Sequence, residues 1–376
     1  MRASRKWERG QARPRPVSDP RALVLDASGL RERLVRQPRL SVAREGILST
    51  IGNTPLVRLT RALPGVPLRV FAKLESFNPS GSIKVRAAFR ILRHAIDAGN
   101  IRPGATVIES SSGNMGIGLA QLCAYFGLRL VCVVDPRTTS ENLAILRAYG
   151  AEVDMVSEPD PTTGEFLQAR LDRVQSLLRS MPNSFWPDQY SNVYNAVAHH
   201  ETMHEIVTQL GGPVDYLFCA TSTCGTIRGC AEYIREHRLA TTIIAVDAAG
   251  SVIFGGPPGR RLIPGHGASK RPKLWQPGLT HRCIHVSDLE CIVGCRRLLR
   301  REAILAGGSS GGILMALDRV AAELPRDAAC VLVFPDQGER YAHSIFSDVW
   351  VREHFGDVSG RWEDHRGGAL WMTATS

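Results

Sequence analysis

Lys84 combines a reactive side chain with a position that would activate it. It follows the turn Asn78-Pro79-Ser80-Gly81, and the residues after it are good helix formers. We therefore expect Lys84 in the first turn of a helix, where the peptide dipoles disfavour the ammonium form. The neutral amine is the nucleophile that forms a Schiff base. Because an isolated lysine at such a place is more often a surface residue, the neighbouring motifs must decide.

Three short loops rich in glycine, serine and threonine supply surroundings that such a lysine would need. They are residues 110–115 (SSSGNM), 221–226 (TSTCGT) and 307–312 (GGSSGG), and each follows a predicted strand and precedes a predicted helix. In open α/β sheets ligands bind at the carboxyl ends of the strands, where loops of this kind gather. Each loop taken alone could simply be a well-capped helix start.

The composition of each loop indicates a different part of a ligand. Residues 110–115 suit a carboxylate, and Asn114 could also donate to an oxygen on a bound ring. Residues 221–226 suit a phosphate. No Gly-Lys-Ser/Thr follows them and the chain has no Gly-x-Gly-x-x-Gly, which argues against a nucleoside triphosphate and a dinucleotide. The phosphate of a smaller cofactor remains, and a serine of residues 307–312 could meet its heterocyclic nitrogen.

The elements that must position these loops alternate along the chain. Strands are predicted at 68–74, 105–109, 130–134, 153–156, 216–220, 243–246 and 330–334, with helical stretches between them. This alternation predicts an α/β fold with mostly parallel sheets and helices on both faces. With 376 residues, 44% of them hydrophobic, the chain is long enough for two lobes with separate cores.

The net charge of +10 is concentrated at the start of the chain, because residues 1–45 hold twelve Arg and Lys against five Asp and Glu. This predicts a basic, disordered N-terminal extension. Because the charge belongs to this extension and not to a folded face, no nucleic acid is expected as a partner. No secretory signal or membrane span is recognised. The nine cysteines lack metal-type spacing. Together these observations predict a cytoplasmic protein with reduced thiols and no metal.

Taken in order, the motifs resemble those of the cysteine synthase family, the fold-type II pyridoxal-phosphate enzymes related to the β chain of tryptophan synthase. The resemblance extends from Ile47 to Ile345 and rests on 50–59 (TIGNTPLVRL), 78–89 (NPSGSIKVRAAF), the three loops and 335–341 (PDQGERY). It implies a homodimer of two-lobed chains. The larger, cofactor-binding domain would comprise 46–77 and 191–355, the smaller, mobile substrate domain 78–190, and a C-terminal tail 356–376.

The resemblance also implies roles for individual residues around pyridoxal 5′-phosphate. Lys84 would form the internal Schiff base, Asn114 would face the ring hydroxyl, and Ser309, with Ser310 as a neighbouring alternative, would face the ring nitrogen. The phosphate would be held by Ser222, Thr223, Cys224, Gly225 and Thr226. The loop that takes the substrate carboxylate would include Ser111, Ser112 and Met115, although the family usually has threonine at the last position.

Further segments are similar to a subgroup that makes 2,3-diaminopropionate precursors for siderophores and peptide antibiotics. They are 109–116 (ESSSGNMG), 134–137 (VDPR), 185–192 (FWPDQYSN) and 246–255 (VDAAGSVIFG). This resemblance implies a transferase that replaces the phosphate of O-phospho-L-serine with the amine of L-glutamate. Cations for the anionic groups would come from Arg86, Arg137, Arg228, Arg260, Arg261 and Lys270. Two alternatives stay open: a cysteine synthase that uses sulfide, and a non-catalytic homologue that binds a partner.

Overall fold

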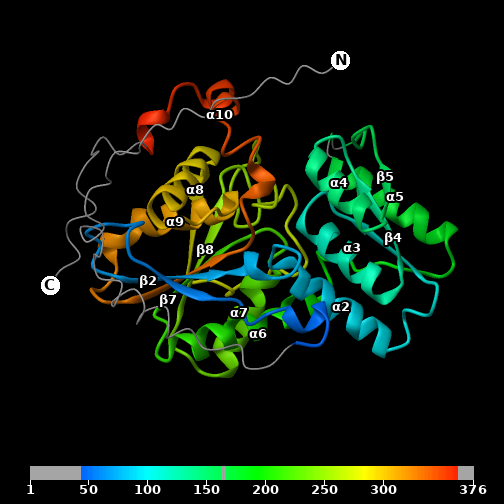
Figure 1. The fold of residues 1–376 in the computed structure, drawn as a ribbon, viewed down its shortest axis with the longest axis horizontal. Coiled ribbons are helices and arrows are strands. Elements are labelled where there is room, and N and C mark those ends of the chain that lie inside the picture. Colours follow the sequence, from blue (N-terminus) through cyan, green and yellow to red (C-terminus); the bar gives the residue numbers. More distant parts are fainter. Residues whose placement is uncertain (1–43, 163, 165, 363–376) are drawn as a thin grey trace, which may run out of the picture. The chain divides into compact units, whose positions relative to one another are not determined.

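The computed structural model describes residues 44–162, 164 and 166–362, so nearly all of the predicted N-terminal extension lies outside the described residues. The described residues from Gly46 to Trp362 belong to one compact unit, and the architecture below is that of this unit. It contains two β-sheets with helices on both faces (Figure 1). The predicted α/β class with mostly parallel sheets is confirmed.

The elements follow one another in regular alternation. The strands are β1 (Leu56–Leu59), β2 (Arg69–Leu74), β3 (Thr106–Ser110), β4 (Arg129–Val134), β5 (Glu152–Met155), β6 (Ser184–Phe185), β7 (Tyr216–Ala220), β8 (Thr242–Ala248), β9 (Arg282–Val286) and β10 (Ala329–Phe334). The α-helices are α2 (Lys84–Asp97), α3 (Asn114–Phe126), α4 (Ser140–Ala148), α5 (Phe166–Ser180), α6 (Val193–Leu210), α7 (Gly225–Glu236), α8 (Asp288–Glu302), α9 (Gly308–Val320) and α10 (Asp348–Phe355). Short 3-10 helices are η2 (Ile47–Thr50), η3 (Glu75–Phe77), η4 (Ala321–Glu323), η5 (Glu339–Tyr341) and η6 (Ser359–Arg361).

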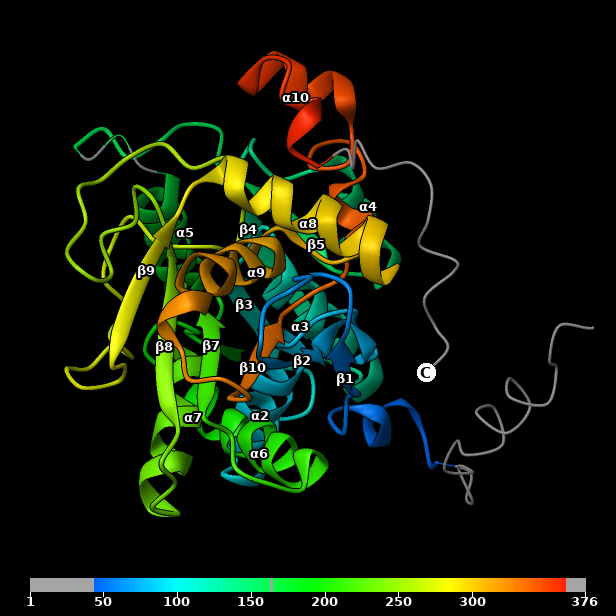
Figure 2. The same ribbon diagram turned by 90° about the vertical axis from the view of Figure 1, so that its left-hand side faces the viewer.

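The larger sheet has six strands in the order β1-β2-β10-β7-β8-β9. Only β1 runs antiparallel to its neighbour, and the other pairs are parallel. Every residue of β10 is buried, as expected for a central strand covered on both faces. Helices α8 and α9 lie on one face of this sheet, and α6 and α7 lie on the other (Figure 2).

The smaller sheet has four parallel strands in the order β5-β4-β3-β6. Its side chains alternate between two cores, as the pleat of a strand requires. Val107 and Cys132 pack with α2 and α3, whereas Ile108 and Val133 pack with Val174 of α5. The continuous apolar runs of β3 and β4 are therefore explained by helices on both faces.

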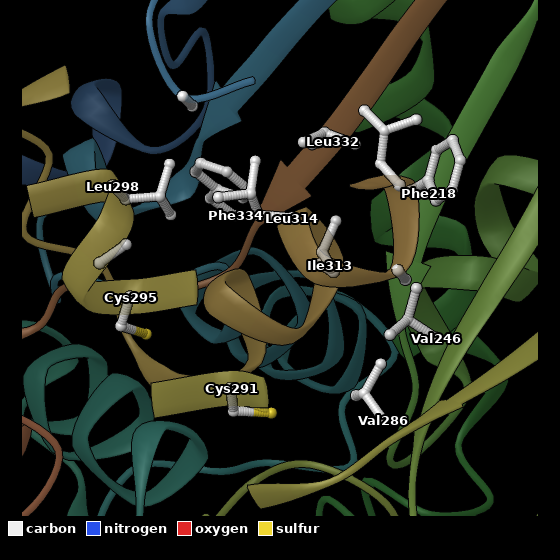
Figure 3. Packing of buried hydrophobic residues seen from close by; sticks show 14 of the residues in the cluster. Phe218, Val246, Val286, Cys291, Cys295, Leu298, Ile313, Leu314, Leu332 and Phe334 are labelled. Carbon is white, nitrogen blue, oxygen red and sulfur yellow. The ribbon is translucent and has the colours of Figure 1, made fainter. Parts of the chain in front are cut away.

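The core of the larger sheet is shown in Figure 3. Phe218 of β7, Phe334 of β10 and Ile313 of α9 belong to one buried cluster, which also contains Cys291 and Cys295 of α8. Burial raises the pKa of the Cys295 thiol to about 12, so it is protonated at neutral pH. All nine cysteines are free, and the described residues contain no group of three His, Cys, Asp or Glu arranged to hold a metal ion.

Helix α9 starts in the third loop, and its place is fixed by a close approach to α8. A Cβ atom at Gly294 of α8 would lie 2.1 Å from the carbonyl oxygen of Gly311. Only glycine permits this spacing, so the backbones of the two helices lie in direct contact. The glycine-rich sequence of residues 307–312 thus serves helix packing as well as any ligand.

The predicted division into two domains, with a mobile smaller one, stays a prediction, although strands from 106–185 do form a sheet separate from the others. Within the predicted tail 356–376, the described residues 356–362 include η6 and the buried Trp362, whose ring lies 4.5 Å from the guanidinium carbon of Arg296. No helix in the described part of the chain has the length and apolar character that a membrane crossing requires.

Candidate active site

Lys84 is the first residue of α2, as the sequence predicted, and the turn before it is attached to the end of β10. The N–H of Ile83 donates to the carbonyl of Pro335 at 2.8 Å, and Ser82 forms an isolated bridge with Asp336. No side chain caps the helix. Main-chain contacts with the carboxyl end of a central strand therefore position Lys84.

Within the described residues, the amine of Lys84 has one hydrogen bond, a long one of 3.4 Å from Nζ to Thr223 Oγ1. Burial lowers the pKa of Lys84 to about 8, against the opposing influence of Cys224 and Asp336. Relative to an exposed lysine, the neutral fraction at neutral pH is larger by roughly two orders of magnitude. The site therefore favours the nucleophilic form, but burial is the main cause of this, whereas the sequence argument relied on the helix dipole.

Residues 221–226 connect β7 to α7 and lie against α6. Asn195 Nδ2 donates to Thr223 Oγ1 at 3.2 Å, and a Cβ atom at Gly225 would lie 2.1 Å from Asn195 Oδ1. Thr226 Oγ1 lies 3.3 Å from His199 Nε2. Asn195 and His199 are one helical turn apart, so a single face of α6 supports the loop.

Cys224 has the left-handed backbone conformation, with φ of 64°, at the position where the loop enters α7. This conformation is unfavourable for a residue other than glycine and marks a constrained turn. The thiol is buried, and this burial raises its pKa to about 12. Ser222, by contrast, is half-buried, so its hydroxyl remains accessible.

Residues 307–312 contact Asp336, in the segment that follows β10. The N–H of Gly307 donates to the main-chain carbonyl of Asp336 at 3.0 Å, and a Cβ atom at Gly307 would lie 2.0 Å from Asp336 Oδ1. Ser309 is 8% exposed. Ser310 is fully buried, and its hydroxyl has no partner among the described residues. Such an unpaired buried hydroxyl is unfavourable unless a bound group completes it.

Asn114 begins α3, and it joins the first loop to the other two. Its Nδ2 donates to Asp336 Oδ2 at 2.8 Å, and Arg340 donates to its Oδ1. Through Asp336 and Thr223, all three predicted loops therefore meet around Lys84. The carboxyl ends of β3, β7 and β10 are brought together, as expected for a ligand site in an open α/β sheet.

Comparison with known proteins shows the family to which the chain belongs. Residues 47–336 match the family described as "Pyridoxal-phosphate dependent enzyme". The chain belongs to this family of pyridoxal-phosphate-dependent enzymes. The cysteine synthase-like resemblance seen in the sequence is thereby confirmed, as is pyridoxal phosphate as the cofactor.

Three similar proteins indicate the branch of the family. N-(2-amino-2-carboxyethyl)-L-glutamate synthase of Ralstonia nicotianae is 45% identical over 308 residues, which cover 82% of this chain and 91% of the relative. The O-acetylserine-dependent cystathionine β-synthase of Helicobacter pylori superposes with a TM-score of 0.75 at 30% identity, covering 81% of this chain and 98% of its own. A cysteine synthase of Entamoeba histolytica gives a TM-score of 0.75 at 32% identity, covering 81% and 90%.

The described residues fit pyridoxal phosphate. Lys84 offers a buried amine without a close carboxylate partner, and the start of α7 offers main-chain N–H groups and threonine hydroxyls for a phosphate. The unpaired hydroxyl of Ser310, beside Ser309, is suited to a ring nitrogen. The donor set thus contains a separate group for each polar part of the cofactor.

The loop predicted for the substrate carboxylate is only partly available to a ligand. Ser111 Oγ accepts from the N–H of Gly116 at 2.9 Å, so this hydroxyl caps the turn. Ser112 is half-buried, and its carbonyl accepts from Asn142 Nδ2 at 3.0 Å. Met115 is 2% exposed and packs in the core of the smaller sheet. Any contact of Met115 with a substrate must therefore use its main chain.

Arg137 is exposed on the loop after β4, and its guanidinium carbon lies 4.8 Å from the centre of the Phe166 ring. Its N–H donates to Asp135 Oδ1 at 2.9 Å. The cation is thus accessible, is held by an aromatic ring and has no ion pair with any residue that the structure describes. Its contact with a substrate stays a prediction.

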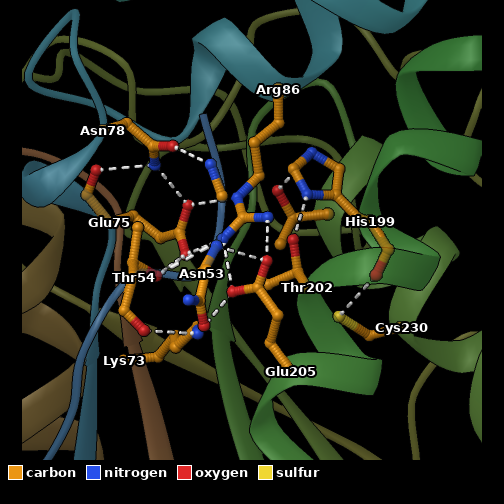
Figure 4. Close-up of polar contacts among 12 residues, drawn as sticks. Asn53, Thr54, Lys73, Glu75, Asn78, Arg86, His199, Thr202, Glu205 and Cys230 are labelled. Atoms are coloured by element: carbon orange, nitrogen blue, oxygen red, sulfur yellow. Dashed lines mark hydrogen bonds and ion pairs between the residues drawn. The ribbon is translucent and has the colours of Figure 1, made fainter. Parts of the chain in front are cut away.

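Arg86, another candidate cation, is instead committed to a buried ion-pair network (Figure 4). Its Nε donates to Glu75 Oε2 at 2.7 Å, and its Nη1 donates to Glu205 Oε1 at 2.7 Å. Lys73 Nζ completes the network with a 2.6 Å contact to Glu205 Oε2. All four side chains are at most 8% exposed. The suggestion that Arg86 binds substrate is therefore wrong, because its guanidinium N–H groups already donate to two buried carboxylates.

Two other features escaped sequence reasoning. Burial raises the pKa of Glu109, at the end of β3, to about 8, although N–H groups of Ser110, Trp186 and Gln189 point at its carboxylate. His199 is neutral at neutral pH, because burial, helped by the Arg86 charge, lowers its pKa well below the usual value. In the sequence, His199 is four residues after Asn195, which places both on one face of a helix. This spacing becomes informative only when α6 is known to contact residues 221–226.

Proposed function

We propose that the protein is a pyridoxal-phosphate-dependent transferase that joins O-phospho-L-serine to the amine of L-glutamate. The products would be N-(2-amino-2-carboxyethyl)-L-glutamate and phosphate. The observation that carries this proposal is the 45% identity, over 91% of its length, to a relative that bears the corresponding synthase name. Use of the product for a siderophore or a peptide antibiotic through 2,3-diaminopropionate is part of the same proposal, as is a cytoplasmic location.

In this proposal Lys84 both holds the cofactor and moves a proton. When bound, pyridoxal phosphate supplies an aldehyde that captures an amine and a ring that withdraws electrons from the attached carbon. Lys84, once released by the incoming substrate, takes the proton from the substrate Cα and later returns it. Its lowered pKa supports this role, because a base with a pKa of about 8 has an appreciable neutral fraction near physiological pH, whereas an ordinary lysine has almost none.

The remaining residues would bind and orient. Ser222, Thr223, Cys224, Gly225 and Thr226 would hold the cofactor phosphate at the start of α7, and Asn114 the ring oxygen. Ser309, or its neighbour Ser310 with the unpaired hydroxyl, would hold the ring nitrogen. A neutral hydroxyl at the ring nitrogen favours prompt β-elimination over a long-lived carbanion. The substrate carboxylate would lie on the loop of Ser111, Ser112 and Met115, and Arg137 is proposed for the substrate phosphate, since arginine binds oxyanions through two donors.

Mass spectrometry of the products tests this function. The reconstituted enzyme receives O-phospho-L-serine with L-glutamate, L-aspartate, L-ornithine and sulfide as competing nucleophiles. The expected main product is the glutamate adduct, together with inorganic phosphate. Cysteine as the main product would instead assign a cysteine synthase activity, and the absence of any adduct with a correctly bound cofactor would favour a non-catalytic homologue. O-acetyl-L-serine in a parallel reaction identifies the preferred leaving group.

We also propose that the protein is a homodimer. Phe77, in the segment before α2, is 65% exposed, and Val193, at the start of α6, is 48% exposed. Large exposed apolar side chains often mark contact surfaces between subunits. Light scattering should give a mass near twice the chain's 41.1 kDa, whereas the mass of a single chain would exclude the proposal.

A further inference from the structure

Asn114 is held from two sides by groups of opposite hydrogen-bonding character. Asp336 presents an acceptor to its Nδ2 at 2.8 Å, and Arg340 presents a donor to its Oδ1. A guanidinium can only donate, and Asp336 Oδ2 already accepts a 2.8 Å hydrogen bond from the Tyr341 hydroxyl. The amide of Asn114 therefore has a single favourable orientation. In the reversed orientation its NH2 group would face the Arg340 donor, and its oxygen would face the Asp336 acceptor.

This arrangement leaves one N–H donor of Asn114 free. Nδ2 carries two N–H groups, and only the one toward Asp336 has a partner within residues 44–162, 164 and 166–362. Its acceptor Oδ1, in contrast, is engaged by Arg340. Asn114 can thus offer a ligand a donor whose direction is already determined.

The two clamping residues are themselves anchored. Asp336 is 3% exposed, lies two residues after the end of β10 and forms the bridge with Ser82. Arg340 also donates to the main-chain carbonyl of Ser80, in the turn that leads to Lys84. The hydrogen bonds of Asn114 and Arg340 are partly buried, and the one from Tyr341 to Asp336 is fully buried, so they are less exposed to competing water than surface contacts are. One pair of side chains therefore connects the start of α3, the Lys84 turn and the end of β10.

We propose that Asp336 and Arg340 are positioning residues that direct the free N–H of Asn114 toward the ring oxygen of pyridoxal phosphate. The inference rests on the proposed cofactor site, and it adds two residues that act through Asn114. An N–H donor at the ring oxygen stabilises negative charge there, so the clamp sets the electronic state of the bound cofactor as well as its affinity.

The test compares the visible absorption spectrum and cofactor dissociation constant of the holoenzyme in three variants. Asn114→Ala should shift the cofactor band and weaken cofactor binding roughly tenfold, because a hydrogen bond to a charged group is lost. Arg340→Met should shift the band in the same direction, and Arg340→Lys, which keeps a donor, should restore much of it. Arg282→Met is the matched control, because Arg282 pairs with Glu323 on the surface and should leave the spectrum unchanged.

A double variant separates positioning from a general structural effect. If Arg340 acts through Asn114, Arg340→Met should change the spectrum little further in the Asn114→Ala background. An equal spectral change in both backgrounds would overturn the inference, as would a normal spectrum of Arg340→Met beside a shifted one of Asn114→Ala. An unchanged spectrum of Asn114→Ala would instead remove Asn114 from the proposed cofactor site. Should Arg340→Met fail to fold, Asp336→Asn carries the same comparison, because it changes the other residue that holds the Asn114 amide.

Discussion

At the scale of single residues, the reactive amine of Lys84 has no ion pair with any described residue and only one long hydrogen bond. Lys84 Nζ has a 3.4 Å hydrogen bond to Thr223 and lies in a buried environment that favours loss of its proton. A short ion pair would favour the ammonium form, as Glu205 does at 2.6 Å from Lys73, where it opposes the burial that lowers the pKa of Lys73. The two lysines thus show how the same side chain serves structure in one place and chemistry in another.

This difference predicts how cofactor attachment depends on pH. The cofactor-free protein should attach pyridoxal phosphate covalently through Lys84, with a rate that rises about tenfold per pH unit and levels off near pH 8, because only the neutral amine reacts. Stopped-flow absorbance measures the rate, and borohydride reduction with peptide mapping locates the bond. Lys84→Ala is the control. A midpoint near the ordinary 10.5 would show that burial does not activate this lysine.

At the scale of elements, the Arg86 network explains why α2 begins where it does. The helix has no side-chain cap, but Arg86 in its first turn binds Glu75 of η3 and Glu205 of α6. Burial alone would raise the pKa of Glu205, but hydrogen bonds and charge from Arg86 and Lys73 hold it at about 2. The two cations and two carboxylates balance, so the network can remain charged in the interior.

Removing Arg86 should therefore destabilise the fold strongly. Arg86→Met leaves two buried carboxylates without their partner, and the free energy of unfolding should fall by about 3–5 kcal/mol. Arg93→Met on the same helix is the matched control. Its ion pair with Asp97 has side chains that are 59% and 55% exposed, so the change should stay within about 0.5 kcal/mol. Urea titrations at neutral pH measure both, and similar values for the two variants would contradict this interpretation.

At the scale of the whole molecule, the sequence was informative wherever local rules decide structure. Lys84 was placed at a helix start by the preceding turn, and the strand–helix alternation predicted both sheets. The edge strands β1 and β9 were not singled out, because short strands with exposed residues carry a weak pattern. Arg86 was misinterpreted for a different reason: its partner Glu205 lies 119 residues away, and charge alone does not reveal such a contact.

The two-sheet arrangement also leads to a prediction about motion. We expect residues 78–190 to move toward the larger sheet when a substrate binds, since closure excludes water from the site. Limited proteolysis of the smaller domain should then be slower with O-phospho-L-serine than with its D-enantiomer, which serves as the matched control. Equal cleavage rates with and without the L-enantiomer would count against closure.

The position of β10 has a consequence for how the polypeptide acquires its structure during synthesis. This strand occupies the centre of the larger sheet, between β2 and β7, yet it is the last strand of that sheet to leave the ribosome. Until Phe334 has emerged, β2 and β7 each present an unpaired edge that can associate with other chains. Translation that stops before Ala329 would thus release a product prone to aggregation, and chaperones would be needed most in that interval.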